Sequence, residues 1–156
     1  MLLLIAGCPA TGKTTFVHKN WPNDTVIEFD EWVTAYYNLP FVEAMDKYVA
    51  EFPESQHRYF NEIGKKYRDN ADVIVCDTFT YKKDREDFLC YMDEKFGIPK
   101  EEIKLLYLVA KYRTIEERNR KRIGAVPENI MLTMFYNQEF PTVSEKFGSV
   151  EIVANE

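Results

Sequence analysis

A glycine-rich segment near the start of the sequence has the residue types and the spacing that bind phosphates. Residues 7–14 read GCPATGKT and match the pattern GxxxxGK[ST] in full. In such a loop, backbone N–H groups turn inward onto phosphate oxygens, and the following helix adds its partial positive charge. Lys13 would lie between the β- and γ-phosphates, and the Thr14 hydroxyl would ligate Mg²⁺. The residues expected to contact ATP are Gly7, Cys8, Pro9, Ala10, Thr11, Gly12, Lys13, Thr14 and Thr15. The alternative is a glycine turn that only joins a strand to a helix.

Two aspartates that follow apolar runs are the next candidates for chemistry. Asp30 closes a run that begins at Val26, and Asp77 closes the run from Val73 to Cys76. In open parallel sheets the ligand crevice lies beyond the carboxyl ends of the strands, so both acids are expected there. Asp77 is predicted to hold Mg²⁺ directly or through water, and Asp30 to accept the proton of an acceptor hydroxyl. Structural alternatives are that Asp30 caps a helix beginning at residue 31 and that Asp77 caps a turn.

A basic cluster at residues 118–122 reads RNRKR and follows a capping-box pattern at Thr114-Ile115-Glu116-Glu117. Arg118 and Arg122 are four residues apart, so on one helix they would share a face. Beside a phosphate loop, this segment is predicted to be a lid whose arginine stabilises charge on the transferring phosphoryl group. With Lys111 and Arg113, it could instead hold the phosphates of a polynucleotide acceptor. The structural alternative is a solvated helix surface.

The elements that must position these residues follow from the apolar pattern. Short apolar runs predict buried strands near residues 2–6, 26–29, 73–76, 105–109 and 150–153. Between them lie stripes at helical spacing, which we interpret as core faces: Met45, Tyr48, Val49 and Phe52; Tyr59, Phe60, Ile63 and Tyr67; and Phe88, Leu89, Met92 and Phe96. The alternation predicts one α/β domain over residues 1–156, and the phosphate loop and the basic cluster make it a candidate P-loop kinase domain. It would be a three-layer αβα sandwich with a mostly parallel sheet of four to five strands and a helical lid at about 114–126.

Composition limits the function further. The chain has 156 residues, 46% hydrophobic and 29% charged, with a formal net charge of −6. Proteins that coat long stretches of nucleic acid are usually basic, so that class is excluded, although a local patch that grips a strand end is not. Three scattered cysteines fit a reducing compartment, with Cys76 and Cys90 as core residues. The short apolar start and the lack of a membrane-length apolar run predict a cytoplasmic protein with no membrane partner.

The order of these motifs resembles the kinase domain of the phage polynucleotide kinase family over most of the chain. Residues 7–14 are similar to that family's GCPGSGKS loop, Asp30-Glu31-Trp32 to its DD-aromatic segment, and Cys76-Asp77-Thr78 to its SDTN segment. Residues 118–122 and Ala125-Val126-Pro127 are similar to its lid sequence RNxKR followed by AVP. The resemblance implies that Asp30 is the general base, that Asp77 and Thr78 place the acceptor, and that Arg118 and Arg122 contact the nucleotide.

The resemblance also implies transfer of the γ-phosphate of ATP to the 5′-hydroxyl of a DNA or RNA end, with Mg²⁺. Two departures bear on the acceptor: Val33 stands where the family has an arginine, and Phe79 stands where it has an asparagine. No DxDGT motif of the family's phosphatase half is present. The alternatives are a kinase of a nucleoside, a small metabolite or a modified base in DNA, and an ATPase switch module without an acceptor of its own.

Overall fold

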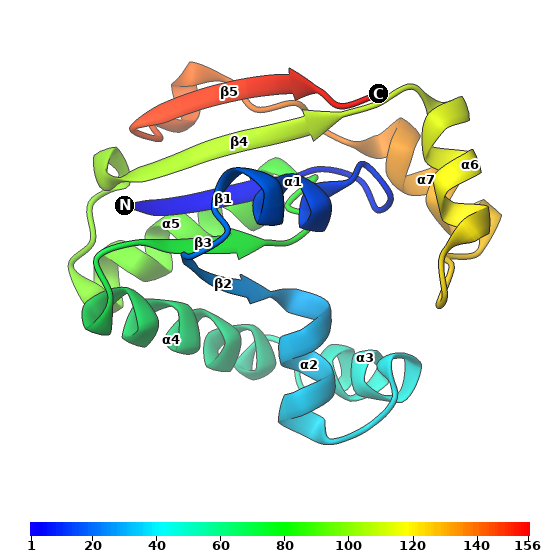
Figure 1. Cartoon of the computed structure of the whole chain (residues 1–156). Helices are drawn as coiled ribbons and strands as arrows, with labels where there is room; N and C mark the ends of the chain where they lie inside the picture. The colour runs from blue at the N-terminus through cyan, green and yellow to red at the C-terminus, as the bar shows by residue number, and fades with distance from the viewer.

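Five strands form one parallel sheet in the order β2-β3-β1-β4-β5 in the computed structural model, which describes residues 1–156. The strands are β1 (Leu2–Ala6), β2 (Thr25–Glu28), β3 (Val73–Cys76), β4 (Ile103–Val109) and β5 (Ser149–Ala154). Every residue of β1 and β3 is buried, which explains why these strands are uninterrupted apolar runs. Because all five strands are parallel, their carboxyl ends meet at one edge of the sheet (Figure 1).

Helices cover both faces of the sheet and extend past its carboxyl edge (Figure 1). Helix α1 (Lys13–Asn20) covers one face, while α4 (Glu54–Asp69) and α5 (Lys82–Phe96) cover the other. Beyond the carboxyl edge lie α2 (Phe29–Tyr37) and α3 (Phe41–Ala50) on the side of β2, and α6 (Tyr112–Lys121) and α7 (Glu128–Asn137) on the side of β4. Two 3₁₀ turns, η1 (Lys100–Glu102) and η2 (Val143–Glu145), precede β4 and β5.

Alternate residues of the central strand face two separate cores. Leu2 and Leu4 pack with side chains of α4 and α5, whereas Leu3 and Ile5 pack with Val17 of α1. Truncating a fully buried leucine to alanine costs about 2–5 kcal/mol, so this strand contributes stability to both layers. The predicted three-layer α/β sandwich is confirmed, and its sheet is entirely parallel rather than mostly so.

Two predictions about buried residues are wrong. The stripe on α3 is not a core face, because Val49 and Phe52 are 66% and 50% exposed and Ala44 is the one buried residue of that helix. The helix packs against α2 and α4 at the edge of the molecule, so most of its surface meets solvent. Cys90 lies on the exposed side of α5, while Cys76 is buried as predicted. No helix combines the length and the apolar character needed to cross a membrane.

Candidate functional site

The phosphate loop joins β1 to α1 and depends on its two glycines. Gly7 and Gly12 have φ values of +145° and +87°, in the region that favours glycine. A Cβ atom on Gly7 would lie 2.5 Å from the carbonyl oxygen of Leu108, and one on Gly12 would lie 2.6 Å from Nδ2 of Asn155. Helix α1 then begins at Lys13 without a side-chain cap, so its first N–H groups stay free for a phosphate.

The other predicted loop residues divide into buried and accessible groups. Cys8 and Thr11 are buried, and the Thr11 hydroxyl donates to the Cys8 carbonyl at 2.9 Å, which closes the turn. Pro9 and Ala10 are partly exposed, whereas Thr14 and Thr15 are exposed on the first turn of α1. Burial raises the pKa of the Cys8 thiol to about 11, so it is neutral near pH 7 and has no nucleophilic role.

Lys13 bends back over the loop, where its Nζ donates to the carbonyls of Gly7 at 2.8 Å and Cys8 at 2.9 Å. Burial lowers the pKa of Lys13, and the negative charges of Asp77 and Asp30 counteract part of that effect. The charges of Asp77 and Asp30 thus act on Lys13 near the carboxyl edge of the sheet, where a parallel sheet binds its ligand.

Asp77 directly follows β3, and its backbone is fixed to the central strand. Its N–H donates to the Ile5 carbonyl at 3.2 Å, and the next carbonyl, that of Thr78, accepts from the Gly7 N–H at 2.9 Å. Burial raises the pKa of Asp77 to about 7, and the charge of Asp30 adds to the rise. The Thr78 N–H, which donates to Oδ1 of Asp77 at 2.6 Å, opposes that rise. A carboxyl group with this pKa can both donate and accept hydrogen bonds near neutral pH.

Asp30 is not the last residue of a strand but the second residue of α2. The helix begins at Phe29 and has no side-chain cap, so the interpretation of Asp30 as an N-cap is wrong. The side chain stays open to solvent, yet enough protein surrounds its carboxyl group to raise its pKa. The charges of Arg122 and Lys13 oppose that rise, which places Asp30 between the lid and the phosphate loop.

Glu28, at the end of β2, is a candidate that the sequence analysis missed. Burial raises the pKa of Glu28, and the Thr14 side chain beside it counteracts that rise. The Oε1 atom of Glu28 is buried and has no hydrogen-bond partner. Carboxylate and hydroxyl oxygens are the ligands that Mg²⁺ prefers, and Mg²⁺ is commonly held by one or two carboxylates together with phosphates and water. Glu28 and Thr14 therefore fit a magnesium ion that arrives with a nucleotide. In the sequence, the signal for this candidate is the position of Glu28, an acid directly after the apolar pair Val26-Ile27.

The predicted lid segment lacks its capping box at the start of α6, and hydrogen bonds close the loop that follows the helix. Helix α6 begins at Tyr112, so Thr114 lies within the helix and the predicted capping box is absent. The Thr114 hydroxyl instead donates to Oε2 of Glu156 at 2.9 Å. At the other end, the buried Asn119 side chain donates to the Val126 carbonyl at 2.7 Å and accepts from the Val126 N–H at 3.0 Å. These two bonds close the loop of residues 120–126 into a fixed shape.

The two lid arginines have different surroundings. Arg118 Nη1 donates to the carbonyls of Thr11 at 3.2 Å and Asn155 at 2.8 Å, so its guanidinium braces the phosphate loop from outside. Arg122 follows the last residue of α6 in an extended conformation, so the two arginines do not share a helix face. The Arg122 side chain is exposed, and its charge acts on Asp30 across the site.

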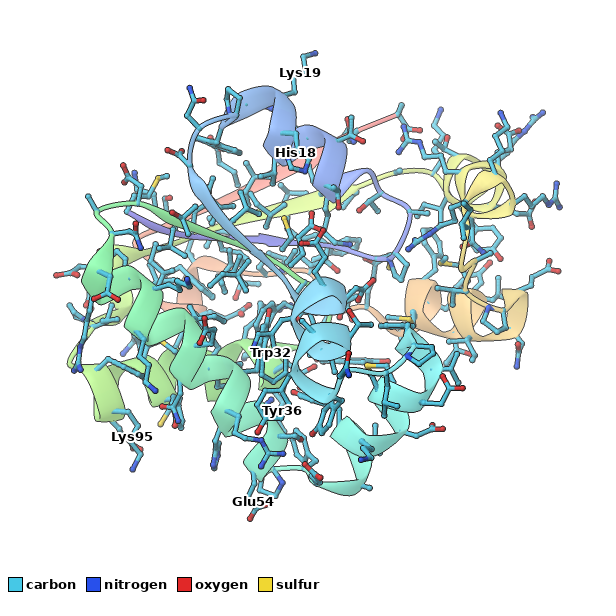
Figure 2. All side chains as sticks on the ribbon, turned by 60° about the horizontal axis from the view of Figure 1, so that its bottom comes forward. His18, Lys19, Trp32, Tyr36, Glu54 and Lys95 are labelled. Carbon is cyan, nitrogen blue, oxygen red and sulfur yellow. The ribbon has the colours of Figure 1, made fainter.

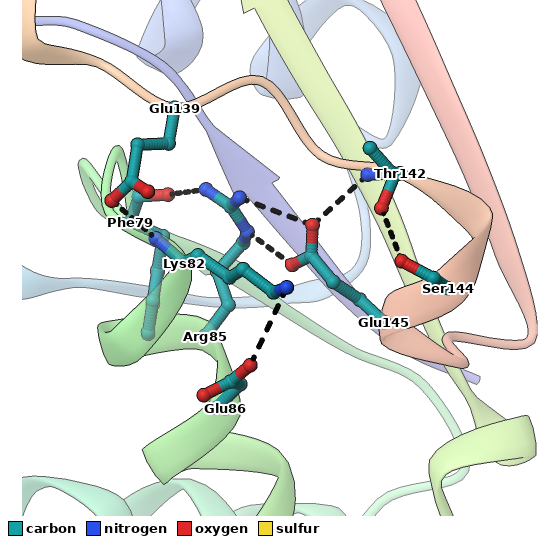
Figure 3. Close-up of polar contacts among 8 residues, drawn as sticks. All are labelled: Phe79, Lys82, Arg85, Glu86, Glu139, Thr142, Ser144 and Glu145. Carbon is teal, nitrogen blue, oxygen red and sulfur yellow. Dashed lines mark hydrogen bonds and ion pairs between the residues drawn. The ribbon is translucent and has the colours of Figure 1, made fainter.

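A buried ion pair holds the loop after β3, as Figure 3 shows. Arg85 of α5 pairs with Glu145 through Nε at 2.7 Å and Nη2 at 3.2 Å, and both side chains are almost fully buried. Arg85 Nη1 also donates to the carbonyl of Phe79 at 2.8 Å, and Phe79 has a φ of +41°. Losing one partner of such a pair costs about 3–5 kcal/mol, because the other charge stays buried. The pair therefore fixes the backbone that carries Asp77 and Thr78.

Comparisons with known proteins identify a family and several solved structures with the same fold. A family model described as an AAA domain matches residues 2–141. A search of curated proteins found no match to the sequence. The fold is similar to that of a gluconokinase from Sinorhizobium meliloti 1021, with a TM-score of 0.62 and 14% identity over 99% of this chain and 82% of that one.

Two further solved structures have the same fold. A sugar kinase from Janibacter sp. HTCC2649 gives a TM-score of 0.61 with 15% identity, over 97% of this chain and 83% of that one. A shikimate kinase from Bacteroides thetaiotaomicron gives 0.64 with 14% identity, over 96% of this chain and 85% of that one. Because the family model covers most of the sequence, this chain belongs to the AAA-domain family, and it has the α/β fold of the P-loop kinases.

Proposed function

We propose that the protein is an ATP-dependent kinase that transfers the γ-phosphoryl group to a hydroxyl group of a small molecule. The observation that carries this proposal is that the charges of Lys13 and Arg122 both act on the Asp30 carboxyl group beside an open glycine loop. Lys13 and Arg122 supply positive charge where the phosphoryl group would pass, and Asp30 supplies a carboxylate opposite them.

In the proposed reaction, the acceptor hydroxyl gives its proton to the Asp30 carboxylate as its oxygen forms a bond to the γ-phosphorus. The bond from that phosphorus to the bridging oxygen breaks, and ADP leaves with the electron pair. The transition state is loose, so positioning and charge matter more than basicity, and a carboxylate is a sufficient proton acceptor. Lys13 and Arg122 stabilise the charge on the phosphoryl oxygens.

Mg²⁺ would be held by Thr14 and Glu28 together with nucleotide oxygens, and it would neutralise charge on the phosphates. The chain has no cluster of three or more His, Cys, Asp or Glu side chains that could hold a metal ion on its own. This agrees with an ion that depends on the nucleotide for its remaining ligands. The role of Asp77 as a ligand, directly or through water, stays a prediction.

The small-molecule acceptor is supported by the names of the similar structures, a gluconokinase, a sugar kinase and a shikimate kinase. A second candidate acceptor, the 5′-hydroxyl of a nucleic-acid end, is favoured by the lid sequence RNxKR followed by AVP. Its Asn119 forms a paired contact with Val126 that gives the loop one shape. Both candidates use the same groups for phosphoryl transfer.

The test is incubation of the protein with γ-labelled ATP and Mg²⁺ in the presence of hydroxylated metabolites, nucleosides or 5′-hydroxyl oligonucleotides. Transfer of label to a small molecule is the expected result, with Lys13→Ala as the inactive control. Label found mainly on oligonucleotide ends would favour the second candidate. ATP hydrolysis that no acceptor changes would contradict both and favour a switch module.

A further inference from the structure

Strand β5, at one end of the sheet, has a free backbone edge. It pairs only with β4, and Figure 1 shows it as the outermost strand. The Asn155 N–H donates to the Val109 carbonyl of β4, and the direction of the backbone groups alternates along a strand. The N–H and C=O groups of Val150, Ile152 and Ala154 therefore point away from β4 and have no hydrogen-bond partner within the chain.

None of the features that usually protect an edge strand is present on β5. Such features are lysines, prolines, bulges, very short strands and a covering helix or loop. Strand β5 has six residues, SVEIVA, of which Glu151 is the one charged residue. Its register with β4 is continuous from Ser149 to Ala154, so no bulge twists it away. Only Val150 and Val153 are partly buried, so the strand is open to a partner.

The opposite edge of the sheet is built differently. Strand β2 has four residues, none of them exposed, and runs directly into α2. Figure 2 shows Trp32 and Tyr36 on the side of α2 that faces α4, and the two rings stack with their centroids 5.1 Å apart. The guanidinium of Arg58 on α4 lies 5.2 Å from the centre of the Tyr36 ring and fixes α2 further. The short length and the burial of β2 protect this edge, which leaves β5 as the open one.

Exposed apolar side chains lie beside the free edge. Ile152 is 51% exposed, and its register partner on β4 is Tyr107. The Tyr107 ring lies with its centroid 5.7 Å from that of Phe140, which is 54% exposed. Val143, on the same connection from α7 to β5, is 87% exposed. Because register partners point to the same face of a sheet, Ile152 and Phe140 flank Tyr107 and form an apolar margin along the edge.

We propose that β5 pairs antiparallel with β5 of a second copy of this chain, about a two-fold axis at Ile152. The sheets of the two copies then form one continuous sheet. An antiparallel pair uses the same backbone groups from each strand, so a free edge is complementary to itself under a two-fold axis. This inference does not depend on the proposed function.

The register follows from the outward-facing residues. With the axis at Ile152, this residue opposes its own copy and Val150 opposes Ala154, so every outward residue exchanges both backbone hydrogen bonds. Glu151 then lies opposite Val153 of the second copy. An axis at Glu151 would place two glutamates directly opposite each other, which is destabilising. An axis at Val153 would leave Val150 without a partner in β5.

The size of the contact sets its expected strength. Stable dimers bury roughly 1,200–2,000 Å² of surface in total, which is more than one pair of short strands provides. The apolar margin supplies further area: Ile152 meets its copy at the axis, and Phe140 and Val143 extend the contact beyond the backbone. We therefore expect a dissociation constant on the order of micromolar, as for a small interface.

Sedimentation velocity of the full chain at protein concentrations of about 1 to 100 μM tests the proposal around this dissociation constant. We expect a monomer–dimer equilibrium whose Kd rises at least about tenfold in Ile152→Lys, because two lysines then oppose each other at the axis. The matched control is Val49→Lys, which alters an exposed valine of α3 and should dimerise like the wild type. A monomer at every concentration, a dimer that Ile152→Lys leaves intact, or an open-ended series of larger oligomers overturns the proposal.

Amide hydrogen exchange tests whether the backbone edge itself makes the contact. In the absence of nucleotide and at one high protein concentration, the N–H groups of Val150 and Ala154 should exchange at least about tenfold more slowly in the wild type than in Ile152→Lys. The Val153 N–H, which points toward β4, is the internal reference and should change less. A second variant, Ile152→Pro, removes an outward N–H that β4 does not use, so it should weaken the dimer while the fold is kept. Equal exchange of Val150 and Ala154 in both proteins would place the contact elsewhere and overturn the proposal.

Discussion

The phosphate side and the acceptor side of the site are built in opposite ways. The phosphate loop is held through its own backbone: the Gly7 N–H donates to the Thr78 carbonyl, and the side chains of Arg118 and Asn155 donate to the Thr11 carbonyl. The side proposed to hold the acceptor depends instead on side chains, with Asp30 on α2 and Asp77 after β3. Backbone amides bind phosphate oxygens in any sequence that provides the right glycines, whereas side chains set which acceptor fits. The difference explains why the loop motif can be read from the sequence and the acceptor cannot.

Lys13 is the point at which the two sides meet, and its loss has the largest expected effect. Lys13→Ala removes the cation between the phosphates and should lower phosphoryl transfer by on the order of 10³-fold. Steady-state kinetics with saturating acceptor would measure the change. Lys19→Ala, on an exposed position of α1, is the control and should behave like the wild type. Retention of more than a tenth of the activity in Lys13→Ala would exclude the proposed site.

Asp30 belongs to the acceptor side, and its replacement should separate binding of ATP from reaction. Asp30→Asn should reduce kcat by on the order of 10²-fold while the Kd for ATP changes little, because the amide cannot take the hydroxyl proton. The control is Glu43→Gln, an exposed acid of α3. An unaltered kcat in Asp30→Asn would show that another group takes the proton.

Replacement of Arg122, compared with replacement of Arg120, tests whether the segment after α6 acts as a lid. Arg122→Ala should lower kcat by about tenfold or more with a smaller change in ATP affinity, since we propose that its charge acts on the transferring group rather than on bound nucleotide. Arg120→Ala removes a guanidinium two residues away that pairs with Glu116 at the surface, and it should have no effect on turnover. Equal behaviour of the two variants would mean that the lid assignment is wrong.

Glu28 and Asp77 are rival carboxylates for the metal. Glu28→Gln should raise the Mg²⁺ concentration needed for half-maximal activity several-fold, because it removes a charge next to Thr14. A titration of activity against Mg²⁺ at fixed ATP measures this. If Asp77→Asn alone shifts the Mg²⁺ requirement, the sequence-based prediction of Asp77 as the ligand is correct and the one made from Glu28 is wrong.

Asp77 also predicts a small dependence of stability on pH. Its pKa is raised from the ordinary 3.8 to about 7 in the folded protein, so the folded state binds the proton more tightly than the unfolded state. This contribution to stability is therefore lost as the pH rises from about 4 to 7 and stays lost above 7. Asp77→Asn should raise the Tm by a few degrees at pH 8 and by less at pH 5. A thermal melt in the absence of ligands measures both, and an equal gain at the two pH values would contradict the assigned pKa.

Much of the fold could be predicted because burial on two faces leaves a plain signal in the sequence. The runs at 2–6 and 73–76 are fully buried strands, as predicted. The prediction that α3 has a core face failed because helical spacing of apolar residues does not reveal whether other elements cover them. The capping box at Thr114 failed because Glu156, far away in the sequence, takes that hydroxyl.

The site was only partly predictable for a related reason. Lys13 could be predicted from the glycine-loop motif between β1 and α1, and Asp77 from its position directly after β3. Glu28 could not be distinguished from an ordinary surface acid until the Thr14 side chain was seen beside it. The contact of Arg118 with the phosphate loop could not be predicted from the sequence either, because its partners, Thr11 and Asn155, are distant along the chain.

The contact between Asn155 and the phosphate loop has a consequence for measurements in solution. Its side chain donates to the Thr11 carbonyl at 2.7 Å, and its N–H donates to the Val109 carbonyl at 2.8 Å, so the residue after β5 links the loop to the neighbouring strand. Ordering of the loop by nucleotide should then slow amide hydrogen exchange in β5, which touches no phosphate. Hydrogen exchange in β5 would thus report whether a nucleotide occupies the phosphate loop.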